Sequence, residues 1–277
     1  MQIPLFVVDA FTDRPFAGNP AAVCVLPEER EDAWMANVAR EMNLSETAFL
    51  RREGDVWSLR WFTPTVEVAL CGHATLASAH ALWQAGLVPG ASPIVFSTRS
   101  GRLGATPGGN GIELDFPAEP AVAGPPPAGL LESLGVTAPL YAGRNRMDSL
   151  VEIESEQALR SLSPDFPALS AATRPDRGVI VTARSDSPDF DFVSRYFAPA
   201  AGIDEDPVTG SAHCCLGPYW AARLGKRELV GFQASARGGT VGVRVSGDGR
   251  VALIGRAVTV TRGELVEDGP RPGIARR

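Results

Sequence analysis

The sequence predicts an α+β protein built from two pseudo-symmetric domains. Strand-like and helical runs alternate along the chain, a linker-like segment lies near its middle, and short motifs of the first half return in the second. A chain of 277 residues also favours two domains of about 130 residues each over one large core. The segment PAEPAVAGPPPAG (117–129) has the composition of a linker. We therefore expect domains over residues 1–120 and 121–277, with the last strands free to cross back to the first domain.

Short runs of alternating or apolar residues, separated by glycine and proline turns, predict the strands. They cover 5–11, 21–26, 46–52, 56–62, 93–98, 111–116, 149–154, 178–183, 241–246 and 251–260. EREDAWMANVAREMN (29–43) has a helical pattern. LGATPGGNG (103–111) has neither the lysine of a P-loop nor Rossmann spacing and indicates a hairpin turn.

The two halves share motifs in the same order. RWFTP (60–64) returns as RYFAP (195–199), and CGHATLASAHAL (71–82) aligns with TGSAHCCLGPYW (209–220). An arginine, two aromatic residues and a proline, followed by a glycine that opens a helix of small residues, form a specific pattern. It predicts an internal repeat. Two similar domains would enclose a cleft, where ligands commonly bind.

The helix after Cys71 carries almost no charge on any face. GHATLASAHALWQAG is apolar all round, which predicts a buried helix running through the middle of its domain. A glycine at its start leaves the first amide groups unobstructed, and these groups with the positive dipole end form an anion site. The second copy begins in the same way, at Thr209, Gly210 and Ser211. Two such helix starts facing one cleft would suit a small carboxylate.

Composition excludes several functions. The net charge of −6 and the absence of a basic block argue against nucleic acid as a partner. The first residues, MQIPLFVVDAF, do not resemble a signal peptide, and we see no apolar stretch long enough for a membrane span. With only four cysteines, two of them adjacent, the sequence does not indicate a disulfide framework. We expect a cytoplasmic protein that does not bind membranes.

Glu46 is the first candidate for catalysis. Strand alternation places it on one face with Ala48 and Leu50 of a half-buried strand. Either the carboxylate is a solvated edge residue, paired for example with Arg51, or it is a desolvated group suited to general acid–base work. Spacing alone leaves both interpretations open.

Other candidates lie at the two helix starts. His73 is in the first turn, where the positive helix end favours a neutral imidazole, although it could simply bond its own backbone. Asp206 precedes a proline, which favours an extended conformation and could aim the carboxylate into the cleft. Ser211 is the repeat counterpart of His73, but a serine at a helix start is usually a cap. His80 fits a buried core histidine.

Other chemistries find little support. Cys71 with His73, or His213 with its neighbours Cys214 and Cys215, offers metal-binding atoms, but there is no paired-cysteine or HExxH spacing, and we expect no metal. A G-x-S-x-G nucleophile elbow is also missing from the sequence.

Four motifs together resemble the PhzF family of phenazine-biosynthesis isomerase-like proteins. They are VDAFTDRPFAGNPAAV (8–23), SETAF (45–49), FTPTVEVALCGHATLASAHAL (62–82) and DEDPVTGSAH (204–213), in the family's order. The resemblance spans nearly the whole chain. It implies the diaminopimelate epimerase-like fold, in which each of two domains is a sheet wrapped as a barrel around a central helix. It also implies an active site between the domains, a homodimer and no cofactor.

The resemblance further implies roles for individual residues. Glu46 matches the glutamate that takes a proton from one carbon of the substrate and returns it to another. His73, Asp206 and Ser211 match the residues that support this step, and Asn19 matches a residue lining the cleft from the first domain.

The helix starts complete the implied site. The amides of Gly72 and Gly210 would hold the carboxylate of a small substrate. Epimerases of this fold use two opposed cysteines, whereas here Cys71 faces Thr209, and both are expected to contact the substrate. The lack of a second thiol makes an amino-acid or hydroxy-acid epimerase or racemase the alternative, with a non-catalytic carboxylate-binding protein as a third possibility.

Overall fold

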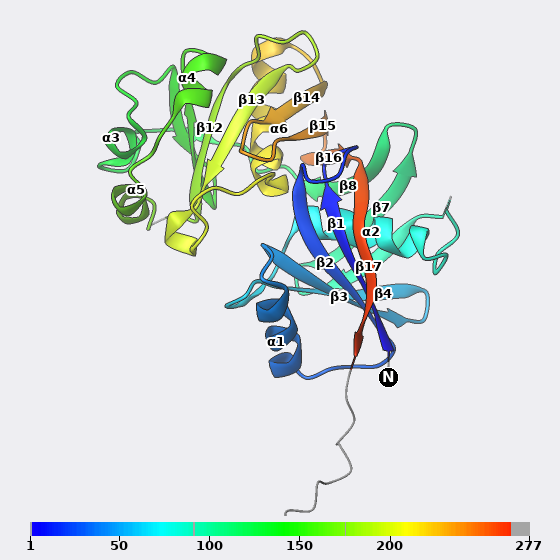
Figure 1. Ribbon diagram of the computed structural model, residues 1–277. Coiled ribbons are helices and arrows are strands. Elements are labelled where there is room, and N and C mark those ends of the chain that lie inside the picture. Colours follow the sequence, from blue (N-terminus) through cyan, green and yellow to red (C-terminus); the bar gives the residue numbers. More distant parts are fainter. Residues whose placement is uncertain (1, 91, 175, 267–277) are drawn as a thin grey trace, which may run out of the picture.

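A buried helix organises each half of the chain (Figure 1). The structure, a computed structural model, describes residues 2–90, 92–174 and 176–266. The first half contains β1 (Gln2–Ala10), β2 (Asn19–Leu26), α1 (Asp32–Met42), β3 (Glu46–Glu53), β4 (Val56–Phe62), β5 (Glu67–Val68), α2 (Gly72–Gln84), β6 (Ile94–Thr98), β7 (Gly101–Gly108) and β8 (Gly111–Pro117). The second contains β9 (Val122–Ala123), α3 (Leu130–Leu134), β10 (Tyr141–Arg144), β11 (Asp148–Glu152), α4 (Glu156–Ser161), α5 (Phe166–Ala172), β12 (Gly178–Arg184), β13 (Phe192–Phe197), α6 (Gly210–Leu224), β14 (Glu228–Gln233), β15 (Gly239–Val245), β16 (Arg250–Gly255) and β17 (Ala257–Val266).

The central helix α2 is apolar all round, as the sequence predicts. Most of α2 is buried, and strands β1, β2, β3, β8 and β17 pack around it. In the second half β14, β15 and β16 pack on α6. The apolar character of α2 therefore reflects burial inside a curved sheet. Within the described parts of the chain, none of the helices has the length and apolarity needed to cross a membrane.

Strand pairing confirms the internal repeat. In the first half β2 is parallel to β3, β3 antiparallel to β4, and β4 parallel to β6, which continues into the antiparallel strands β7 and β8. The second half shows the same order of pairings with β11, β12, β13, β14, β15 and β16. In each half the central helix lies in the connection between the second pair of parallel strands. The sheets join where β16 pairs with β8.

The repeated arginine has the same role in both halves. Arg60 on β4 makes two hydrogen bonds to Glu67, at 2.8 and 2.6 Å. Arg195 on β13 makes two to Glu205, at 2.7 and 2.8 Å. Each guanidinium also lies over the ring of the phenylalanine two residues further along. The motif therefore fixes the end of the strand that precedes the central helix.

The structure divides the predicted strand 251–260 into two. β16 ends at Gly255, and β17 begins at Ala257 and pairs with β1 of the first half over its whole length, from Ala10 to Gln2. A side chain at position 255 would collide with Phe11, since a Cβ there would lie 2.4 Å from the ring. The chain thus passes from the second lobe back to the first at this point.

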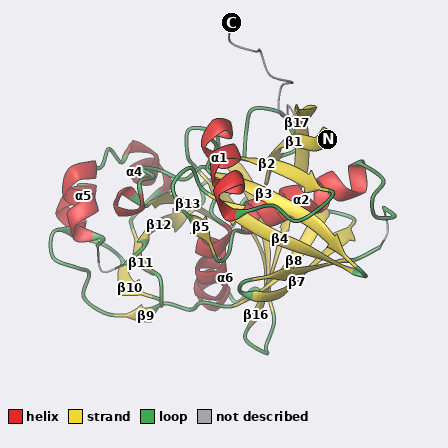
Figure 2. Cartoon of the chain, turned by 90° about the horizontal axis from the view of Figure 1, so that it is seen from below, coloured by secondary structure: helices red, strands yellow, loops and turns green. Residues whose placement is uncertain are grey.

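The strand of Glu46 is buried on both faces and not on one. Ala48 and Leu50 pack in the core around α2, as expected. Phe49, on the opposite face, is also buried because α1 covers that side with Met35. In the second lobe α3, α4 and α5 cover the outer face of β12 in a similar way, with α4 and α5 far from α2 (Figure 2).

Candidate active site

The N-terminal ends of α2 and α6 meet at a cavity of about 590 Å³. Loop and strand residues from both lobes line it, so it lies between them. With the exception of Asn19, the predicted site residues all contribute to its wall: Glu46, Cys71, Gly72, His73, Asp206, Thr209, Gly210 and Ser211. The fold therefore gathers residues from three separate motifs.

Glycine allows the two helix ends to approach each other closely. A Cβ on Gly72 would lie 3.4 Å from the Cα of Gly210, and one on Gly210 would lie 3.3 Å from the Cα of Gly72. The N-cap residues, Cys71 and Thr209, give no side-chain cap to their helices. Uncapped N–H groups and two positive dipole ends thus converge on one place, which suits an anion.

Glu46 is the first residue of β3, and only 13% of its side chain is exposed. Its Oε2 lies 3.1 Å from Nε2 of His73, but the two are not aligned as a hydrogen bond, and Oε2 has no hydrogen-bond partner among the described residues. Arg51 pairs with Glu29 and Glu53 instead, so the interpretation of Glu46 as a surface ion pair is wrong. The carboxylate is partly desolvated and not held by an arginine.

His73 carries a proton more readily than the sequence predicts. Burial lowers the pKa of its imidazole, but the negative charges of Cys71 and Glu46 outweigh burial and raise this pKa well above its usual value. Burial is also the main cause that raises the pKa of the Cys71 thiol, and the charge of Glu46 adds to it. This direction differs from the expectation of a neutral imidazole, which considered only the helix end. Nδ1 lies 3.5 Å from the sulfur of Cys71.

Asp206 is almost fully buried beside this pair. Its Oδ1 accepts a hydrogen bond from Asn19 at 2.8 Å, and its Oδ2 accepts one from the hydroxyl of Thr209. Burial is the main cause that raises the pKa of Asp206 to about 6, and Glu46 adds to it, while the charge of His73 and the two hydrogen bonds oppose it. The carboxyl can therefore exchange a proton near neutral pH.

The position of Asn19 differs from the expectation that this residue lines the cleft. It is fully buried behind the wall and does not line the cavity. Its amide donates to Asp206 and, at 2.9 Å, to the carbonyl of Val208, and it lies 3.2 Å from Nδ1 of His73. Asn19 thus fixes two site residues from behind.

Two polar partners of the site have no motif in the sequence. Gln233 on β14 accepts the N–H of Thr209 at 2.9 Å and donates to the carbonyl of Asp206 at 2.7 Å. Arg177, just before β12, donates to the hydroxyl of Ser211 at 2.7 Å. Ser211 is the second residue of α6 and not its cap. These residues could have been found only through the fold.

Three side chains of the site could hold a metal ion. A carboxylate oxygen of Glu46, the sulfur of Cys71 and a ring nitrogen of His73 all lie within 4.8 Å of one another. The sequence did not indicate this set of three ligands because Glu46 lies on β3, apart from Cys71 and His73 at the start of α2. His213, by contrast, is buried in α6 and bonds the carbonyl of Thr209 at 2.9 Å.

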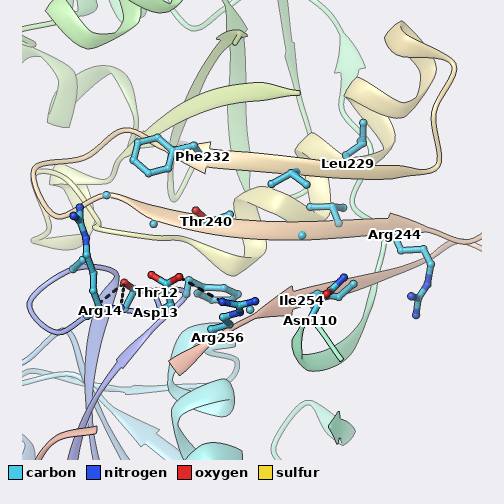
Figure 3. Close-up of a pocket in the computed structure, with 18 of the residues that line it drawn as sticks. Thr12, Asp13, Arg14, Asn110, Leu229, Phe232, Thr240, Arg244, Ile254 and Arg256 are labelled. Carbon is cyan, nitrogen blue, oxygen red and sulfur yellow. Dashed lines mark hydrogen bonds and ion pairs between the residues drawn. The ribbon is translucent and has the colours of Figure 1, made fainter. Parts of the chain in front are cut away.

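Another cavity, of about 690 Å³, lies between the loop after β1 and strands β14 and β15 (Figure 3). Thr12, Asp13 and Arg14 line it on one side, and Phe232 and Thr240 on the other. It contains none of the predicted site residues. The predicted site residues therefore gather at the cavity between the helix ends and not at this one.

Comparison with known proteins supports the assignment of the fold. The chain is similar to a PhzF family protein of Enterococcus faecalis, with a TM-score of 0.90, 42% identity, and 96% of this chain and 100% of that chain covered. A hydroxyproline epimerase of Agrobacterium vitis shares the fold at 13% identity, with a TM-score of 0.63 and 97% and 94% covered. The predicted epimerase-like fold is confirmed.

The sequence relatives agree with the structural ones. An uncharacterized isomerase of Halalkalibacterium halodurans is 56% identical, over 96% of this chain and 99% of the relative. One of Pseudomonas aeruginosa is 51% identical, over the same shares. These names confirm the predicted enzyme class, isomerase, at this general level. The family pattern of PhzC-PhzF, described as phenazine biosynthesis-like protein, matches residues 8–263. The chain therefore belongs to the PhzC-PhzF family.

Proposed function

We propose that this protein is a cofactor-independent isomerase that moves a proton between two carbons of a small carboxylate, with Glu46 as general base and then acid. One observation carries the proposal. The Glu46 carboxylate lines the cavity with little exposure, and its charged neighbour is His73, at 3.1 Å, and not an arginine, so it can take a proton from a bound substrate.

The surrounding groups suit such a step. A substrate carboxylate held by the N-terminal ends of α2 and α6 would place a neighbouring carbon close to Glu46. Charge that develops on the substrate as the proton leaves would be stabilised by the two helix ends and by the imidazolium of His73. Asp206, whose pKa is about 6, helps to fix the position of His73 through Asn19 and that of the N-terminal end of α6 through Thr209. Glu46 then returns the proton to the second carbon.

An epimerase needs a second base on the opposite face of the substrate. Thr209 occupies that position, and its hydroxyl donates to Asp206. A hydroxyl that already gives its proton to a carboxylate is a poor base. Epimerase activity on an amino or hydroxy acid is therefore the second candidate, and it would be revealed by loss of optical rotation in a panel of chiral acids.

The test is Glu46→Gln, which keeps the shape of the side chain and removes its proton affinity. A panel of small carboxylates is incubated with protein in heavy water, and deuterium uptake and isomer formation are followed by NMR. We expect the variant to lose at least about 1,000-fold in turnover of any substrate found. Glu53→Gln, at the exposed end of the same strand, is the matched control and should keep full activity.

Thermal unfolding of both variants shows whether the fold is intact. A folded Glu46→Gln protein that turns over the substrate at the rate of the unaltered protein would refute the role of Glu46. The homodimer and the cytoplasmic location stay predictions, to be checked by light scattering and cell fractionation.

A further inference from the structure

The wall of the cavity that belongs to the second lobe carries an arginine with unused donors. Arg177 lines the cavity and 39% of its side chain is exposed. Its Nε and Nη2 donate to the two carboxylate oxygens of Asp148, at 3.3 and 2.9 Å, and Nη2 also donates to Ser211. The third nitrogen, Nη1, makes no hydrogen bond to any residue that the structure describes. Two N–H groups therefore remain available.

The network behind Arg177 is rigid. Asp148 is fully buried, and it also accepts a hydrogen bond from the hydroxyl of Tyr196 at 2.8 Å. That hydroxyl accepts from Nε of Arg177 at 3.0 Å. Space for it depends on Gly178, where a Cβ would lie 2.7 Å from the hydroxyl. The guanidinium is thus held in one orientation before any ligand arrives, which lowers the entropy cost of binding.

Ser211 extends the set of donors. Its oxygen accepts from Nη2 of Arg177, so its own O–H hydrogen is free to donate. Nη1 of Arg177 and the hydroxyl of Ser211 therefore present N–H and O–H groups side by side. Such a pair matches the two oxygens of a carboxylate.

We propose that Arg177 is a specificity-determining residue that binds the acidic group of the substrate together with Ser211. The inference rests on the proposed function, because it names the chemical class that this cavity accepts, an oxyacid anion in preference to a neutral amide or alcohol. Nothing in the sequence marks Arg177, which lies in the turn before β12 outside every recognised motif.

The test compares benzoate with benzamide, a neutral molecule of the same shape. The full-length protein, labelled with [¹⁵N]arginine, is titrated with each and followed by NMR of the arginine Nε–H signals. We expect benzoate to bind more tightly and to shift the signal that Arg177→Met removes. In Arg177→Met the ratio of the two dissociation constants should fall by about 10- to 100-fold, the loss expected for charge-assisted hydrogen bonds.

Arg223 provides a matched control. Its side chain is 40% exposed, it bonds a tyrosine hydroxyl at 2.9 Å, and it pairs with the buried carboxylate of Glu152. It does not line the cavity. Arg223→Met should therefore leave the benzoate-to-benzamide ratio unchanged. Because Arg177→Met leaves Asp148 buried and unpaired, the double variant Arg177→Met with Asp148→Asn guards against misfolding and should show the same loss of preference.

The outcomes separate the two proposals. A preference for benzoate that survives in both Arg177 variants overturns the inference and leaves the function of Glu46 untouched. A preference that depends on Arg177, in a protein without isomerase activity, supports the inference while the proposed function fails. Absence of benzoate binding to the unaltered protein overturns the inference.

Discussion

Replacing Asp206 by asparagine should stabilise the protein at neutral pH. Burial raises the pKa of this carboxyl from 3.8 to about 6. Between these two pKa values the folded protein binds a proton that the unfolded chain has released. The contribution of this carboxyl to the free energy of unfolding is therefore fully present below about pH 4 and is lost as the pH rises through 6. A shift of about two units corresponds to about 3 kcal/mol at 1.36 kcal/mol per unit.

Asparagine removes the buried charge but not the side chain. It keeps an acceptor for Asn19, whereas its amide meets the hydroxyl of Thr209, and this exchange costs about 1 kcal/mol of hydrogen bonding. We therefore expect Asp206→Asn to raise the free energy of unfolding by about 1 to 3 kcal/mol at pH 6.5. At pH 4 this carboxyl is neutral in the folded protein and about half ionised in the unfolded chain, so the variant should have lost most of this advantage.

The assay is urea unfolding of both proteins at intervals between pH 4 and 6.5. The difference between the two stability curves isolates Asp206. Asp204→Asn, in the exposed part of the same loop, is the control and should give a flat difference. The reasoning is refuted if the difference for Asp206→Asn is also flat across this range.

Two predictions concern the helix ends and the metal-binding group. Gly210→Ala puts a methyl group 3.3 Å from the Cα of Gly72. It should lower turnover at least tenfold while changing the free energy of unfolding by less than about 1 kcal/mol. Full activity in steady-state kinetics would contradict the tight approach of the helices. Treatment with EDTA should leave turnover unchanged, whereas added Zn²⁺ should inhibit by binding Glu46, Cys71 and His73, and Cys71→Ser should weaken that inhibition about tenfold or more. Activity that disappears with EDTA and returns with Zn²⁺ would show instead that a metal takes part in the reaction.

The sequence predicted those elements whose identity is set by residues close together in the chain. The helix α2 is apolar all round, and the repeated Arg-aromatic-Phe motif marks equivalent strands. The repeat and a cavity between the two helix starts were therefore predicted from short motifs. Glu46, Cys71 and Asp206 could be named because they lie inside those motifs.

Features that depend on distant neighbours could not be predicted in this way. Burial lowers the pKa of His73, whereas Cys71 and Glu46 raise it, and Glu46 comes from β3, which precedes the helix in the sequence. Asn19 is buried behind the wall because the second lobe closes over it with Val208. Arg177 enters the site only because Asp148 holds it there. In each case the decisive interaction joins residues far apart in the sequence.

The pairing of β1 with β17 has a consequence for synthesis of the chain. Gln2 lies opposite Val266, so the barrel around α2 stays incomplete until the chain as far as Val266 has left the ribosome. The second lobe, whose strands β10 to β16 are contiguous in sequence, can assemble earlier. We expect the N-terminal half to wait with an open strand edge during translation, a state prone to aggregation, and truncations that remove β17 to damage the first lobe and not the second.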